Sequence, residues 1–147
     1  MNNKQALVIF LIGLAVIISG GLFWWLWKGE NPEPVANPDI RVGSLKSGDS
    51  IKSPFTITGS ARGIWFFEAS FPIDVVDKDG KVIAQGYAEA QSDWMTENFV
   101  PFKALITFNV TTTQTGEIVL KKDNPSGLPE HDKQIRIPVT LMTTNNP

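Results

Sequence analysis

The chain has 147 residues, with 13 Lys and Arg, 15 Asp and Glu and a net charge of −2. Nucleic acids and anionic lipid surfaces favour clustered positive charge, so nucleic acid is not expected among the partners of this weakly acidic chain. The chain has no cysteine, which excludes disulfides, thiolate metal sites and a thioether-linked lipid anchor.

The N-terminal part is dominated by residues 6–27, which contain no ionisable side chain. A helix of that length is about 33 Å long, enough to cross a hydrocarbon core of about 30 Å, so we predict a transmembrane signal anchor. Lys4 makes residues 1–5 positive, which predicts a cytoplasmic N-terminus and an extracytoplasmic C-terminal domain. Three indole side chains are predicted to lie in the outer headgroup layer: Trp24, Trp25 and Trp27.

An alternative interpretation of this stretch is a cleaved secretory signal with its cleavage site at Ser19-Gly20-Gly21. The apolar run continues to Trp27 before it meets charge, which favours a retained anchor. Residues 28–38 contain three prolines and are predicted to be a Pro-rich linker. Residues 143–147 are predicted to be a disordered tail.

Residues 39–142 alternate apolar and polar side chains between turns rich in Gly, Pro, Asn and Asp. This pattern predicts an all-β fold, an immunoglobulin-like antiparallel β-sandwich of about seven strands, behind one N-terminal transmembrane helix. In the longest strand, Phe67 and Phe71 are expected to face the core and Asp74 to face away. The expected strands are 40–42, 53–58, 66–76, 82–90, 102–110, 116–122 and 135–141.

Several short stretches resemble a known family in their order and spacing. They are residues 51–61 (IKSPFTITGSA), 67–71 (FEASF), 93–96 (DWMT) with 99–102 (FVPF), and 137–139 (IPV). Together they resemble the Gmad-type immunoglobulin-like domain, a bacterial module named from spore-germination proteins. The resemblance spans residues 40–141 and implies an extracytoplasmic β-sandwich that binds or interacts, with no established catalytic residues.

Three aromatic residues are candidates for a binding surface. Trp65 precedes the long predicted strand, and Trp94 and Phe99 lie in the connection at residues 91–101. Exposed rings would suit a sugar ring or a partner protein. Packing is the alternative for each, and Trp94 in particular could close one end of the sandwich.

Two groups of carboxylates are candidates for a metal site. Asp77 and Asp79 precede Gly80 like the start of a calcium loop, but the later glutamate of such a loop is missing, so a hairpin turn is the alternative. Asp123 and Asp132 belong to a second oxygen-rich loop, for which solvation is the alternative. No cofactor is expected.

The sequence assigns no catalytic residue. A Ser-His-Asp arrangement would have to combine His131 with Ser126 and either Asp132 or Asp123, all in one loop without a strained nucleophile turn. We therefore expect a non-enzymatic, single-pass module of the bacterial cell envelope that binds an envelope protein or a cell-wall polymer. The alternatives are a structural subunit of a membrane complex and a hydrolase that uses the His131 loop.

Overall fold

The computed structural model describes residues 37–144 of the chain. The predicted transmembrane segment at residues 6–27, with Trp24, Trp25 and Trp27, lies outside the described residues, as does most of the predicted linker. Within the described range no helix is long and apolar enough to cross a membrane.

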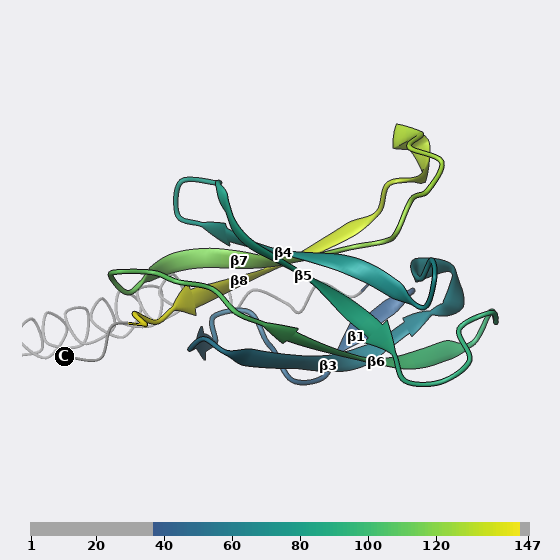
Figure 1. The fold of residues 1–147 in the computed structure, drawn as a ribbon, viewed down its shortest axis with the longest axis horizontal. Coiled ribbons are helices and arrows are strands. Elements are labelled where there is room, and N and C mark those ends of the chain that lie inside the picture. The colour runs from purple at the N-terminus through teal and green to yellow at the C-terminus, as the bar shows by residue number, and fades with distance from the viewer. Residues whose placement is uncertain (1–36, 145–147) are drawn as a thin grey trace, which may run out of the picture. The chain divides into compact units, whose positions relative to one another are not determined.

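The alternating segments form one eight-stranded sheet with the order β1-β3-β6-β5-β4-β7-β8-β2 (Figure 1). The strand that the sequence did not predict is β2, which is two residues long and runs parallel to β8. Two short 3₁₀ turns, η1 (Gly63–Trp65) and η2 (Pro129–His131), lie in the connections. The strands are β1 (Ile40–Val42), β2 (Ser50–Ile51), β3 (Phe55–Arg62), β4 (Ser70–Asp77), β5 (Val82–Ala90), β6 (Phe99–Ile106), β7 (Gln114–Lys121) and β8 (Gln134–Leu141).

The sheet curls so that its two halves face each other and supply both layers of a β-sandwich. Figure 1 shows β4, β7 and β8 in one layer and β1, β3 and β6 in the other. The connecting strand is β5, which pairs with β4 along most of its length and with β6 only at Glu89–Lys103 and Ala90–Phe102. The arrangement agrees with the predicted all-β, immunoglobulin-like domain.

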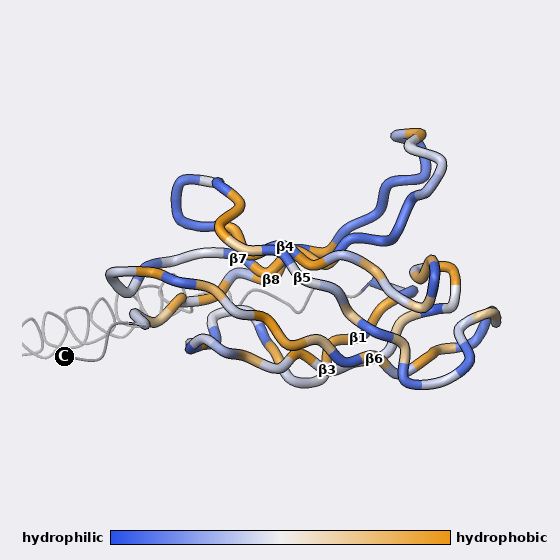
Figure 2. Tube along the Cα trace, viewed as in Figure 1, coloured by the Kyte–Doolittle hydropathy of each residue, from blue (hydrophilic) through white to orange (hydrophobic). Residues whose placement is uncertain are grey.

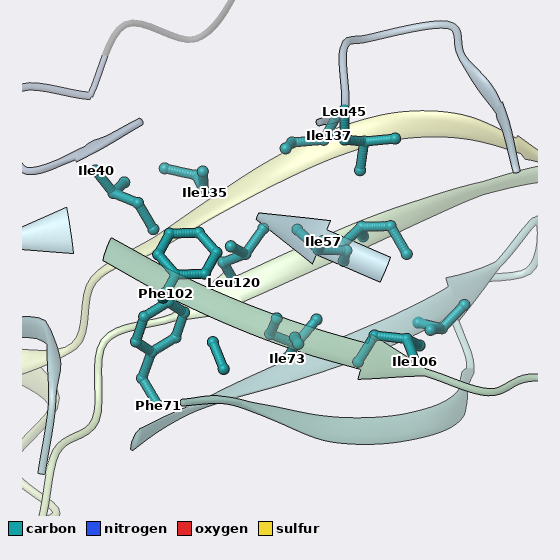
Figure 3. Close-up of a cluster of buried hydrophobic side chains, with 14 of the residues drawn as sticks. Ile40, Leu45, Ile57, Phe71, Ile73, Phe102, Ile106, Leu120, Ile135 and Ile137 are labelled. Carbon is teal, nitrogen blue, oxygen red and sulfur yellow. The ribbon is translucent and has the colours of Figure 1, made fainter. Parts of the chain in front are cut away.

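The core lies between the layers because inward and outward side chains alternate along each strand. In β6, Phe102 and Ile106 are buried while Lys103 and Leu105 between them are exposed. The rings of Phe71 and Phe102 come from opposite layers and meet edge to face with centres 5.1 Å apart (Figure 3). Apolar residues follow the strands, whereas the turns and the long connection between β7 and β8 are mostly hydrophilic (Figure 2).

The strand predicted at residues 66–76 is shorter than expected, because β4 begins only at Ser70. Glu68 and Ala69 have φ angles of 49° and 63°, in the left-handed region, which cannot continue an extended strand. The prediction that Phe67 faces the core is wrong, since this side chain is 43% exposed. Ala69, also predicted to face the core, is only half-buried in this turn. The other residues predicted on the inward face are fully buried: Phe71, Ile73 and Val75.

Alternation puts Asp74 on the outer face of β4, yet the residue as a whole is only 2% exposed. Gln85 on the neighbouring strand donates a hydrogen bond from Nε2 to Asp74 Oδ1 at 2.9 Å. The Lys121 ammonium forms an ion pair with the other carboxylate oxygen. The charge of this buried carboxylate is therefore matched by a cation from β7.

A hairpin turn, the alternative interpretation of Asp77 and Asp79, connects β4 and β5, and the small residues of β5 make room for the opposite layer. A Cβ atom on Gly86 would lie 2.6 Å from Ile106 Cδ1, so a side chain of β6 fills the space above this glycine. The strand predicted at residues 102–110 begins earlier, at Phe99, and ends at Ile106. Two further inward residues of that prediction are buried beyond the end of the strand: Phe108 and Val110.

Candidate functional site

A pocket of about 680 Å³ lies where the start of β4, the end of β5 and the residues after β7 meet. We call it the β4–β5 pocket. None of the aromatic residues predicted for binding lines it. Its lining includes Phe67, Glu68, Ala69, Tyr87, Glu89 and Asp123.

One wall of the pocket is a two-residue hairpin turn. Phe67 and Ser70 exchange two backbone hydrogen bonds of 2.9 and 3.1 Å, and the two residues between them both have positive φ. This is the pattern of a type I′ turn, which favours Asn-Gly at the positions that Glu68 and Ala69 occupy here. The turn leaves Phe67 and Glu68 exposed.

Backbone hydrogen bonds fix the pocket walls to one another. The Ala90 N–H donates to the Ala69 carbonyl at 2.8 Å, which ties the turn to β5. The Asp123 N–H donates to the Trp65 carbonyl at 3.0 Å, which ties the residues after β7 to the segment that precedes the turn. The pocket is therefore built from segments that are far apart in sequence and are joined by backbone hydrogen bonds.

The pocket combines exposed rings with carboxylates. Tyr87 is 62% exposed on β5, and Phe67 also reaches the surface. The carboxylates of Glu68, Glu89 and Asp123 form no hydrogen bond or ion pair with any other residue between positions 37 and 144. The pocket lining therefore carries three carboxylates and no basic side chain.

The structure places the three predicted binding aromatics elsewhere. Trp65 is fully buried and packs edge to face on Phe71, with ring centres 5.7 Å apart, so it cannot belong to a surface platform. Trp94 is partly buried and packs against the core, as its alternative interpretation proposed. Phe99 is partly exposed, but the guanidinium groups of Arg41 and Arg62 lie 4.0 and 4.4 Å from its ring centre.

The first predicted metal group forms a turn between β4 and β5. Asp77 Oδ1 accepts the backbone N–H groups of Asp79 and Lys81, each at 2.9 Å, and Gly80 has a φ of 79°. The carboxylate of Asp79 pairs with the Lys78 ammonium at 2.6 Å. This hydrogen bond, together with the attraction of the opposite charge, raises the pKa of Lys78. Both carboxylates are thus engaged in hairpin interactions.

The second predicted metal group lies in the connection from Lys122 to Lys133, which we call the β7–β8 arm because it projects from the sandwich (Figure 1). Asp123, at its base, lines the β4–β5 pocket, whereas Asp132 accepts a 2.7 Å hydrogen bond from Asn124 Nδ2. Across the described part of the chain, no group of three or more acidic or histidine side chains could hold a metal ion.

The arm also brings together part of the predicted hydrolase arrangement. Ser126 Oγ lies 3.1 Å from His131 Nδ1 and 2.5 Å from the side-chain oxygen of Asn124. Among residues 37–144 no carboxylate is hydrogen-bonded to the His131 ring. A catalytic triad needs such a group to orient the imidazole, so the geometry is that of a loop contact between two exposed side chains.

One pocket residue could be singled out from the sequence, because alternation places Tyr87 at an outward position of β5. The turn at Glu68-Ala69 left no such signal, since these residues continue the apolar–polar pattern of a predicted strand. That Tyr87, Glu68 and Asp123 line one pocket depends on the fold of the whole sandwich.

Comparison with known families agrees with the fold. Residues 39–127 match the model of Gmad2, the immunoglobulin-like domain of bacterial spore germination. No curated protein and no solved structure matches the chain. The matched range covers more than half of the 147 residues and includes every pocket residue named above. The chain therefore belongs to the Gmad2 family of immunoglobulin-like domains.

Proposed function

We propose that the chain is a non-enzymatic interaction module of the bacterial cell envelope. Residues 6–27 hold it in the membrane, and the immunoglobulin-like domain lies outside the cytoplasm. The family match supports the interaction role. The anchor and its orientation are supported by the lack of ionisable side chains in residues 6–27 and by the positive charge of Lys4 before them.

The observation that carries the binding role is the exposure of Phe67 and Tyr87 beside an open pocket. Exposed rings that line a common hollow contribute little to folding, and aromatic side chains are enriched at the centres of protein interfaces. The partner, an envelope protein or a cell-wall polymer, contacts the domain at the β4–β5 pocket.

A photo-crosslinking amino acid at position 87 tests the binding site in cells that express the full chain. Position 105 is the matched control, because Leu105 on β6 is 64% exposed and Tyr87 on β5 is 62% exposed. We expect a discrete crosslinked product from position 87 that is missing from position 105. The same products from both positions, or none from position 87, would contradict a binding role for the pocket.

The orientation can be tested with one introduced thiol, because the chain contains no cysteine. The variant Ser126→Cys carries it in the exposed β7–β8 arm, and Asn2→Cys carries it before the predicted anchor. A membrane-impermeant maleimide should label intact cells at position 126 and require lysis to label position 2. Labelling of position 2 alone in intact cells would reverse the proposed orientation.

The 3.1 Å contact between Ser126 Oγ and His131 Nδ1 is the observation behind one second candidate, a hydrolase. His131→Ala should then abolish hydrolysis of a simple ester. A binding module instead predicts no ester hydrolysis above the buffer rate and an unchanged crosslink from position 87.

A structural subunit of a membrane complex is a further alternative. Assembly of the complex would then depend on residues 6–27, and exchange of that segment for another apolar helix would dissociate the complex.

A further inference from the structure

We infer that the β4–β5 pocket binds a lysine or arginine side chain presented by a partner protein. The inference rests on the proposed function, because it names the chemistry that the same site recognises.

The charge of the pocket favours a cationic group. The ion pairs among residues 37–144 involve Asp39, Asp74, Asp79 and Glu117. The three pocket carboxylates form no ion pair with any residue in that range. Lys103 lies opposite Glu89 in the strand register and forms no ion pair with it. Because the lining holds three acidic and no basic side chains, its field attracts cations and repels phosphate-bearing partners.

The two exposed rings favour an organic cation over a metal ion. A metal ion needs converging oxygen ligands and gains nothing from aromatic faces, whereas ammonium and guanidinium groups are attracted to them. Lysine and arginine also carry an apolar stem that packs on rings while the charged head reaches polar groups. Phe67 and Tyr87 supply the apolar contact, and Glu68, Glu89 and Asp123 surround it with negative charge.

A protein side chain fits this combination better than an amino sugar. The ammonium group of an amino sugar is attached directly to a polar ring, so it has no flexible apolar stem to occupy the space between the rings and the carboxylates. The walls are tied by the backbone hydrogen bonds at Ala69 and Asp123, so the partner meets a preformed hollow.

Binding of defined probes to the full chain tests the inference. The chain is captured through a C-terminal tag on a biosensor in nonionic detergent. The probes are hexalysine, hexaarginine, a hexamer of acetylated lysine as the neutral control, and a chitosan hexamer as the amino-sugar control. We expect saturable binding of the two cationic peptides, binding at least tenfold weaker for the neutral peptide, and a fall in affinity as salt is raised.

Two variants that each remove two negative charges distinguish the effect of the pocket carboxylates from the effect of the domain's overall charge. Glu68→Asn with Glu89→Gln removes two pocket charges, and asparagine is better suited than glutamate to the positive φ at position 68. Glu97→Gln with Glu130→Gln removes two exposed charges that do not line the pocket. The pocket variant should weaken hexalysine binding at least tenfold and the control variant at most twofold, and Tyr87→Ala should weaken it at least fivefold.

Equal loss in the two charge variants, equal binding of the neutral peptide, or binding of chitosan alone would overturn the inference. The crosslink from position 87 distinguishes this result from failure of the proposed function. If that crosslink persists in the Glu68→Asn, Glu89→Gln variant, the pocket is a binding site but not a cation site. If neither the crosslink nor peptide binding is found, both proposals fail.

Discussion

Asp74 and Lys121 show how one buried carboxylate depends on a partner that reaches solvent. The Asp74 side chain is 3% exposed and that of Lys121 is 40% exposed. Removing the lysine leaves a buried charge with only the Gln85 hydrogen bond. Removing the carboxylate charge instead leaves the Lys121 ammonium, which can rotate outward into solvent. Loss of the lysine is therefore expected to destabilise the fold more than loss of the carboxylate charge.

We expect Lys121→Met to lower the free energy of unfolding by about 2 kcal/mol and Asp74→Asn by about 1 kcal/mol. Only the lysine substitution leaves a buried charge without its ion-pair partner. The double variant should be more stable than Lys121→Met alone, since the charge that lost its partner is gone. Chemical denaturation followed by tryptophan fluorescence measures all three. Additive losses would show that the two side chains contribute independently.

At the residue scale, alternation predicts which face a side chain occupies but not what covers that face. It assigned Asp74 to the outer face, and it could not show that Gln85 and Lys121 close over the carboxylate from two neighbouring strands. The same limit applies to Trp65, which is fully buried and packs on the Phe71 ring of β4. Contacts between strands are set by register, which a single sequence does not determine.

Two glycines show how separate elements are held at close range. A Cβ atom on Gly63 would lie 1.9 Å from the Thr96 carbonyl oxygen and 2.4 Å from that of Trp94, so the connection before β6 is pressed onto η1. A Cβ atom on Gly86 would instead meet the end of the Ile106 side chain. A backbone cannot move aside as a terminal methyl group can.

Gly63→Ala is therefore expected to lower the free energy of unfolding by about 3 kcal/mol, and Gly86→Ala by no more than about 1 kcal/mol. Gly43→Ala is the control, because its nearest contact, the Thr58 carbonyl oxygen at 3.8 Å, is of ordinary length. Thermal unfolding by circular dichroism compares the three variants. A loss for Gly86→Ala as large as that for Gly63→Ala would contradict this distinction.

At the element scale, strands with one clearly apolar face could be predicted and irregular segments could not. Residues 135–141 alternate without interruption, and β8 covers nearly the same range. Residues 67–69 show the same alternation, yet two left-handed residues, Glu68 and Ala69, turn the chain there. Glutamate and alanine are unusual in such a turn, so their identity gave no warning of it.

The whole domain gains its stability from contacts between distant segments. The buried apolar cluster extends from Ile40 to Leu141, and the described strand pairs lie in the same range. The sandwich belongs to a compact unit of the chain that spans residues 34–147. The pocket could not be predicted from the sequence, because its walls come from three separate segments: residues 67–70, residues 87, 89 and 90, and residue 123.

A fragment from Pro34 to Pro147 is expected to fold without the preceding residues, because the core cluster and the sheet lie within it. Such a sandwich depends on non-local pairing, so it should unfold in one cooperative transition instead of element by element. Far-UV circular dichroism and thermal denaturation measure this, and a dispersed amide spectrum provides a second readout. A fragment without a cooperative transition would show that the cluster between Ile40 and Leu141 is not sufficient for folding.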